Sequence, residues 1–178
     1  MTRIVYPLLA LAAALTSPLL AQTSALKGLD TNAPIDVDAA RIEIQDAANQ
    51  AIFSGAVVIR QGKLTLNADS VKVLYVRKAG NPEIQRLDAR GNVRLVSPSE
   101  SASGNTGIYD VDNKIITLLG NVLLNRGGSK LNGQRLVINL ATGQSALDGR
   151  SGGTVAASGA TPGRVKAQFQ VQKSATKP

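Results

Sequence analysis

A recurring glycine constrains this sequence more than any other feature. Gly55, Gly91 and Gly120 each begin a Gly-x-Val segment, and from Gly91 the spacing is 29 residues, to Gly120 and then Gly149. Thirteen residues after each of the first three glycines stands another small residue: Ala68, Gly104 and Gly133. A fixed period of this size is typical of stacked repeats. Each unit is expected to be a β-hairpin, and because one hairpin cannot bury its apolar face alone, neighbouring units must stack.

Between the glycines, apolar and polar residues alternate, which predicts strands with two different faces. Leu87, Ala89, Val93 and Leu95 fall on one face of such a segment. No segment with a helical period of 3.6 residues is evident after residue 21. The sequence therefore predicts an all-β fold of stacked antiparallel strands. The expected turns lie at residues 46–49, 61–63 and 127–128, and a polar loop inserted at 77–83 accounts for the longer first interval.

The glycines are expected on the inward face, where a missing side chain lets a sheet bend or another backbone approach. Three such sites at one period would align a crease, so that the sheet folds into a V or a flattened tube lined by Val, Leu and Ile. Two interpretations of that interior remain open. The aliphatic side chains pack as an ordinary core, or they leave a groove for an apolar ligand, whose burial gains about 0.8 kcal/mol per methylene.

The composition argues against several classes of chemistry. The chain has no Cys and no His, which removes disulfides, thiol nucleophiles and the usual general base at neutral pH. No cofactor and no metal site are expected. An enzyme on a β-solenoid remains an alternative, with Asp110 and Asp112 as a pair of carboxylates two residues apart. Most of the acids fall at turns or on the polar face, where a structural role is the simpler explanation.

The first 21 residues have the form of a secretory signal peptide. Arg3 provides the basic start, Leu8–Leu15 the apolar stretch, and Leu19–Ala21 a cleavage site, so the mature chain is expected to begin near Gln22. An uncleaved anchor is the alternative, although the apolar stretch is short for a membrane span of roughly 20 residues. The predicted organisation is a signal peptide at 1–21, one β-domain at 22–149, and a flexible basic tail at 150–178. Alternation at Val165–Val171 is compatible with a last edge strand in that tail.

The formal net charge of +8 is unevenly distributed. Residues 27–59 hold two basic and five acidic residues, residues 60–94 hold eight and three, and the tail at 151–178 holds four basic residues and no acid. A basic surface suits anionic lipid headgroups or an acidic partner. Nucleic acid is not expected as a partner, because aromatic side chains that would stack on bases are scarce. The uneven distribution of charge along the chain also suits head-to-tail docking of unprotected sheet ends.

An ordered set of short motifs carries a family resemblance. The set comprises Ala33–Ala39, Ala51–Val57, Gln61-Gly62, Leu64–Asp69, Leu87–Val93, Gly107–Asp110 and Gly120–Val122. Together these segments resemble the OstA-like family, and within it most closely the periplasmic proteins that bridge lipopolysaccharide transport. The resemblance covers about residues 33–149.

The resemblance implies a β-jellyroll, also called a β-taco, whose hydrophobic groove shelters the acyl chains of lipopolysaccharide without any reaction. It implies partners of the same fold in the inner-membrane and outer-membrane transport complexes, and head-to-tail self-association. The inward residues that it implies as lipid-binding are Ile42, Ile44, Phe53, Val57, Ile59, Leu64, Leu66, Val71, Val73, Val93, Leu95, Ile116, Leu118, Val122, Leu124, Leu136 and Ile138. Gly107 departs from this pattern, because it stands where the other units have Val71 and Leu136, and it leaves the register near Ile108 open.

Three alternatives accompany this interpretation. One is the inner-membrane-anchored relative of the same transport system, which shares the fold and would keep its N-terminus. Another is a structural repeat of the envelope that self-assembles without binding lipid. The enzyme on a β-solenoid is the third.

Overall fold

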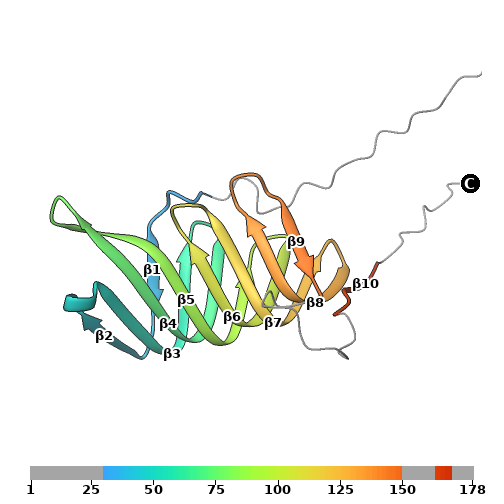
Figure 1. Cartoon of the computed structure of the whole chain (residues 1–178), viewed down its shortest axis with the longest axis horizontal. Coiled ribbons are helices and arrows are strands. Elements are labelled where there is room, and N and C mark those ends of the chain that lie inside the picture. Colours follow the sequence, from blue (N-terminus) through green and yellow to red (C-terminus); the bar gives the residue numbers. More distant parts are fainter. Residues whose placement is uncertain (1–29, 150–162, 170–178) are drawn as a thin grey trace, which may run out of the picture.

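The computed structural model describes residues 30–149 and 163–169, which form one antiparallel sheet with a single turn of 3₁₀ helix (Figure 1). The strands are β1 (Ile35–Asp38), β2 (Arg41–Gln45), β3 (Gln50–Gln61), β4 (Leu64–Lys78), β5 (Asn81–Val96), β6 (Glu100–Asp110), β7 (Ile115–Arg126), β8 (Ser129–Asn139), β9 (Ser145–Asp148) and β10 (Lys166–Gln168). The short helix η1 is Asp46–Ala48. The prediction of an all-β fold of stacked antiparallel strands is confirmed.

Strands β3 to β8 pair in sequence order, each with the next, as expected for stacked hairpins. The ends of this series are covered by short strands. At the N-terminal end both β1 and β2 pair with β3, and at the C-terminal end both β9 and β10 pair with β8. The expected turns at residues 46–49, 61–63 and 127–128 are all present.

A line of β-bulges crosses the sheet at the recurring glycines. The register of β3 against β4 breaks between Ser54 and Val57, and β5 and β7 have the same break around Gly91 and Gly120. At each break two residues of one strand oppose a single residue of its partner, which bends a strand and increases its twist. Because the breaks are aligned from strand to strand, the whole sheet bends along one line, as the spacing predicted.

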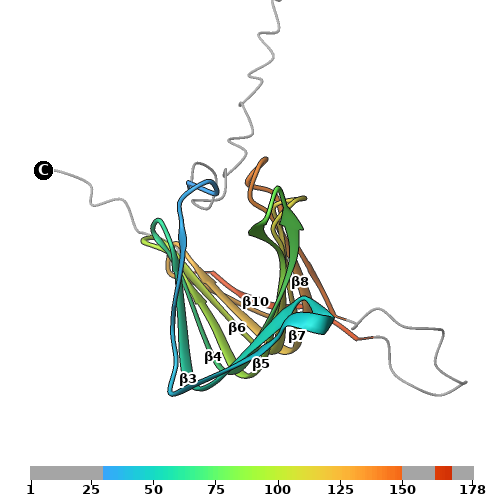
Figure 2. The same cartoon turned by 90° about the vertical axis from the view of Figure 1, so that its left-hand side faces the viewer.

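The bend divides the sheet into two limbs that face each other across a trough (Figure 2). Limb 1 contains β1 and β10, together with the parts of β3–β8 that lie on the same side of the bulges as these two strands. Limb 2 contains β2 and β9, together with the other parts of β3–β8. Each long strand therefore runs through both limbs. The turns between strands form the two rims of the trough, and we call the gap between these rims the mouth.

Left-handed backbone at the bulges explains the glycines, and it corrects their predicted orientation. Gly91 has φ +73° and the following Asn92 has φ +47°, a region that Gly and Asn enter at low cost. A Cβ atom on Gly91 would collide with an Oδ atom of the exposed Asp69. The glycine therefore does not contribute to the inward face; instead, it gives room to a polar side chain along the crease.

The two kinds of strand pass the crease differently, and this keeps the apolar residues inside. On strands β3, β5 and β7 the bulge contains two residues, so every second residue still points inward on both sides of the crease. On β4, β6 and β8 the inward positions on either side of the crease are instead three residues apart: Ala68 and Val71, Gly104 and Gly107, Gly133 and Leu136. This spacing settles the register of β6 near Gly107 and Ile108. Gly107 is buried between Ala89 and Leu118, and Ile108 lies on the outer face.

The insertion in the first interval is a strand extension, and the prediction of a polar loop at 77–83 was wrong. Strand β4 continues to Lys78, and β5 begins at Asn81. The two strands are joined by a turn at Ala79 and Gly80, which both have positive φ. Lys78 forms an ion pair with Glu83 at 2.7 Å. This hairpin is longer than its neighbours, which is visible at the upper left of Figure 1.

The predicted signal peptide lies outside the described residues, as do residues 150–162 and 170–178 of the predicted tail. Within the tail, β10 forms three cross-strand pairs with β8, centred on Ala167 and Leu131. Gly149, which follows β9, lies directly against Gly163.

We expect Gly91→Ala to destabilise the fold by about 2–4 kcal/mol, because it combines left-handed strain with crowding against Asp69. The matched control is Gly80→Ala, which has a similar positive φ but open space around the new methyl group, and should cost only about 1–2 kcal/mol. Urea unfolding of both variants provides the comparison. Equal losses would show that the crease glycine is needed only for its backbone conformation.

Candidate functional site

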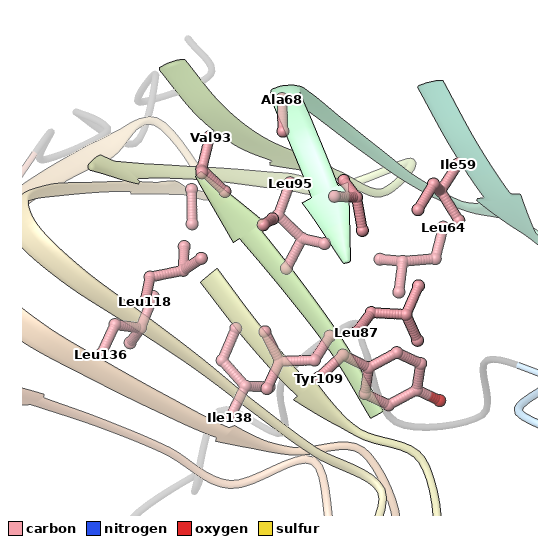
Figure 3. Close-up of a cluster of buried hydrophobic side chains, with 14 of the residues drawn as sticks. Ile59, Leu64, Ala68, Leu87, Val93, Leu95, Tyr109, Leu118, Leu136 and Ile138 are labelled. Atoms are coloured by element: carbon pink, nitrogen blue, oxygen red, sulfur yellow. The ribbon is translucent and has the colours of Figure 1, made fainter. Parts of the chain in front are cut away.

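The facing surfaces of the two limbs form a continuous apolar interior. Three inward rows of side chains run from edge to edge of the sheet. One row in limb 1 passes from Val37 to Ala167, and two rows in limb 2 begin at Ile42 and Ile44 and end at Leu147 and Ser145. Figure 3 shows the centre of this interior, where side chains from both limbs meet. The rows give the trough an apolar lining along its whole length.

Most of the inward residues predicted from the sequence are buried in this interior. Those buried are Val57, Ile59, Leu64, Val71, Val73, Val93, Leu95, Ile116, Leu118, Val122, Leu124, Leu136 and Ile138. Phe53 and Leu66 are partly buried and pack against them. Ile42 and Ile44 follow the inward register but remain 53% and 62% exposed, because β2 is an edge strand with a neighbour on one side only.

The candidate set from the sequence was incomplete. Leu87 and Ala89, which the alternation places on the inward face, are each 1% exposed and belong to the same core. Ala102, Tyr109 and Leu140 are also buried there. Tyr109 was missed because the register of β6 depended on Gly107, and the one-residue shift across the crease has no signal in a single sequence.

A hydrogen bond between buried polar side chains joins the limbs at the mouth. The Tyr109 hydroxyl on limb 2 donates to Oε1 of Gln61 at 3.0 Å, and Gln61 lies at the end of β3 on limb 1. Nε2 of Gln61 donates to the carbonyl oxygens of Thr31 and Ala33, at 2.9 and 3.2 Å. The Gln61 side chain is therefore hydrogen-bonded both to the opposite limb and to the segment that leads into β1.

A second polar contact joins the limbs closer to the C-terminal end. Glu100 is buried in the turn that begins β6 and forms an ion pair with Arg126 at the end of β7, both on limb 1. The Arg126 guanidinium also donates to Oγ of Ser145 on limb 2, at 2.9 Å. A buried carboxylate is costly unless it is paired, so Arg126 satisfies Glu100 and spans the mouth at the same time.

Open space in the trough is distributed unevenly. Below Gln61 and Tyr109 the interior holds a cavity of only about 30 Å³, whose lining includes Ile59, Leu66 and Leu87. At the C-terminal end a cavity of about 600 Å³ lies between the limbs. It is lined by Leu124, Arg126, Gly127, Ser129, Leu131, Leu136, Ser145, Leu147, Val165 and Phe169. That volume lies within the usual range for ligand pockets, which is about 300–1,000 Å³.

The surroundings of Tyr109 and Asp110 shift the pKa values of both side chains. Burial raises the pKa of Tyr109 above its usual 10.0, because the charged phenolate would be desolvated. The associated stability is complete below about pH 10 and is lost as the pH rises through the raised pKa. Hydrogen bonds from the side chain and backbone of Asn113 lower the pKa of Asp110.

Asp110 therefore has the structural role that the turn positions suggested. It ends β6 and accepts hydrogen bonds from Asn113 N at 2.9 Å and Asn113 Nδ2 at 2.8 Å, whereas Asp112 lies in the turn that follows. The two carboxylates therefore do not lie on one strand, unlike the arrangement that the sequence suggested. Within residues 30–149 and 163–169, no group of three or more carboxylates is placed to hold a metal ion.

The comparisons with known proteins agree with this architecture. A family model described as LptA/(LptD N-terminal domain) LPS transport protein matches residues 36–144. An uncharacterised protein of Rhizobium meliloti (strain 1021), R00383, is 32% identical over 164 residues, covering 88% of this chain and 82% of that protein. The crystal structure of LptH from Pseudomonas aeruginosa, titled the LptA homologous periplasmic component of the lipopolysaccharide transport device, superimposes with a TM-score of 0.67. At 22% identity it covers 80% of this chain and 99% of that one.

The creased antiparallel sheet with an apolar interior is the β-jellyroll of lipopolysaccharide-transport proteins. Because the family model matches more than half of the sequence, this chain belongs to the LptA/LptD N-terminal domain family. The resemblance inferred from the motifs is confirmed. In the part of the chain that the structure describes, no helix has the length and apolar character needed to cross a bilayer.

Leu118→Ala should test how far the interior acts as a core. Leu118 is fully buried between the limbs, so its truncation is expected to cost about 3 kcal/mol in the free energy of unfolding. Ile42→Ala on the exposed edge should cost about 0.5 kcal/mol or less. Chemical denaturation measures both values, and a small loss for Leu118→Ala would mean that the limbs barely rely on each other.

Proposed function

We propose that this protein is a periplasmic bridge that shelters the acyl chains of lipopolysaccharide and passes the molecule from the inner-membrane to the outer-membrane complex. The observation that carries the proposal is the apolar trough, which opens into a cavity of about 600 Å³ at its C-terminal end. Membership of the transport family supports it, as does the similarity to LptH, a periplasmic component of lipopolysaccharide transport in Pseudomonas aeruginosa. The signal-like N-terminus is consistent with export.

The physical basis is the division between the inside and the outside of the trough. Acyl chains gain about 0.8 kcal/mol for each methylene that leaves water, and the rows of Val, Leu and Ile offer an apolar surface without requiring specific polar contacts. The polar sugars and phosphates would stay at the mouth. At the C-terminal cavity, Ser129, Ser145 and Arg126 provide polar groups beside the aliphatic floor. The proposed role is binding and hand-over, with no covalent step.

Photo-crosslinking to lipopolysaccharide is the direct test. A photoreactive residue at Leu131 or Leu147, both inward and lining the C-terminal cavity, should crosslink to lipopolysaccharide. The same residue at Asn132 or Ala146, the exposed next positions on the same strands, should not. Side chains of neighbouring strand positions point to opposite faces, so each outward site is a matched control.

The outcomes distinguish the competing functions. Crosslinks only at inward positions support the lipid groove. Folded, strand-rich protein that gives none at any of the four sites argues for a structural envelope repeat, with the aliphatic interior as an ordinary core. N-terminal sequencing of the protein isolated from its native envelope separates a cleaved periplasmic form from the inner-membrane-anchored relative.

We further propose that copies of this chain, or relatives of the same fold, join head to tail through the sheet ends. The support is the register of the outward rows. One row on limb 1 begins at Asp38 on β1 and ends at Lys166 on β10. The row beside the crease on limb 2 begins at Arg41 on β2 and ends at Asp148 on β9.

If the sheet continues into a second copy, each row brings opposite charges together. Lys166 of one copy would face Asp38 of the next, and Asp148 would face Arg41. β10 runs from the crease to the rim and β1 from the rim to the crease, so the new pairing is antiparallel, as is that of β9 with β2. Exposed Ile42 would then lie beside Leu147 and continue the inward row.

Charge reversal should weaken the assembly, and a second reversal should restore it. Lys166→Glu is expected to raise the dissociation constant of the head-to-tail contact about three- to tenfold, because a cross-strand pair of opposite charges becomes a like-charge pair. Combining Lys166→Glu with Asp38→Lys should recover most of the affinity. Sedimentation velocity over a range of concentrations measures both, and a wild-type chain that stays monomeric at high concentration would contradict the proposal.

A further inference from the structure

The mouth of the trough is closed by polar groups at a place where the interior beneath it is filled. Gln61 and Tyr109 are 6% and 7% exposed, although each carries hydrogen-bonding atoms. They come from opposite limbs and are 48 residues apart in sequence, so their hydrogen bond is a tertiary contact across the gap. In Figure 3 the Tyr109 ring lies among the core side chains with its hydroxyl at the edge of the cluster.

The contact is suited to open and close. In the closed state the Tyr109 hydroxyl and the Gln61 amide satisfy each other, and Gln61 also holds Thr31 and Ala33. In an open state, water would take over each of these bonds. The net contribution of such a hydrogen bond to stability is therefore modest, whereas its geometry is specific. A contact of this strength leaves the open state as a minor population that a ligand can select.

The two ends of the trough differ in how much open space lies between the limbs, as a closure at the N-terminal end requires. Beneath Gln61 and Tyr109 the interior between the limbs holds a cavity of only about 30 Å³. The C-terminal cavity holds about 600 Å³ in the same conformation. An acyl chain finds space at the C-terminal end as the structure stands, and it finds none below Tyr109 unless the limbs separate.

We propose that Tyr109 and Gln61 form a reversible latch that controls access of acyl chains to the N-terminal half of the trough. This inference rests on the proposed lipid-binding function. Acyl chains occupy the C-terminal cavity with the latch closed, and they reach the interior beside Leu66 only when the Tyr109–Gln61 hydrogen bond breaks. Arg126 and Ser145 span the mouth closer to the C-terminal cavity and are not part of the latch.

The opening is measurable without any lipid. The natural sequence has no cysteine, so spin labels at Lys63→Cys and Asp112→Cys report on this gap alone. Both positions are exposed, Lys63 in the turn between β3 and β4 on limb 1 and Asp112 in the turn after β6 on limb 2. Pulsed electron paramagnetic resonance should give one narrow distance for the wild type. Tyr109→Phe should raise a second, longer population roughly tenfold.

Tyr75→Phe is the matched control. This variant also loses a tyrosine hydroxyl, but that hydroxyl bonds to Asp46 at an exposed place on limb 2 and does not connect the two limbs. The distance distribution of Tyr75→Phe should therefore equal that of the wild type. Gln61→Met keeps the length of the side chain and removes both of its hydrogen-bonding groups. This second variant should open the mouth as Tyr109→Phe does, and it keeps the test decisive if one variant folds poorly. Identical narrow distributions in all folded variants would overturn the latch.

A second measurement links the latch to lipid. A photoreactive residue at Leu131 should crosslink to lipopolysaccharide quickly and one at Leu66 slowly, and Tyr109→Phe should speed only the reaction at Leu66, by roughly tenfold. Equal rates at the two sites in the wild type, unchanged by Tyr109→Phe, would overturn the gating. No crosslinks at either site would contradict the proposed function instead, and the distance measurement would still decide whether the latch exists.

Discussion

The aligned bulges at the crease are the constraint on which the rest of this structure depends. A flat sheet of these strands would leave a wide aliphatic face in water, because no helix or second sheet in the described residues covers it. The bulges around Gly55, Gly91 and Gly120 fold the sheet so that it covers its own face. The left-handed conformation of two successive residues is what the Gly-x-Val segments provide. The core, the rims and the open end of the trough all follow from that bend.

Alternation and spacing were enough to predict the fold and most of the interior. The 29-residue period gave the stacked hairpins, and the period of two gave the inward face, including Val57, Leu118 and Val122. Both signals are regular spacings along the chain, the first between equivalent positions of successive hairpins and the second between residues of one strand. The outward orientation of the glycines was missed since it depends on the bulge geometry. The extended hairpin at Ala79–Gly80 was missed since its polar composition resembles a loop.

The features that define the candidate site are not local, and for that reason a single sequence does not reveal them. Gln61 meets Tyr109, and Arg126 meets Ser145, only because the crease brings two limbs together. Neither pair has a characteristic spacing along the chain. The C-terminal cavity likewise depends on where β9 and β10 end relative to each other. Sequence reasoning identified the apolar face, and the structure was needed to identify its openings.

Under the proposed function, the residues of the mouth have more influence than their small energies suggest. An acyl chain that enters the N-terminal half of the trough replaces contacts between limbs with contacts between limb and lipid, and both are apolar. The large hydrophobic terms therefore nearly cancel between the closed and loaded states, although each is worth about 25 cal/mol per Å². The remaining difference comes from terms of about 1 kcal/mol, such as the hydrogen bond between Tyr109 and Gln61. A carrier built in this way keeps the N-terminal half of its interior out of water when empty and sets the ease of loading through a few polar contacts at its rim.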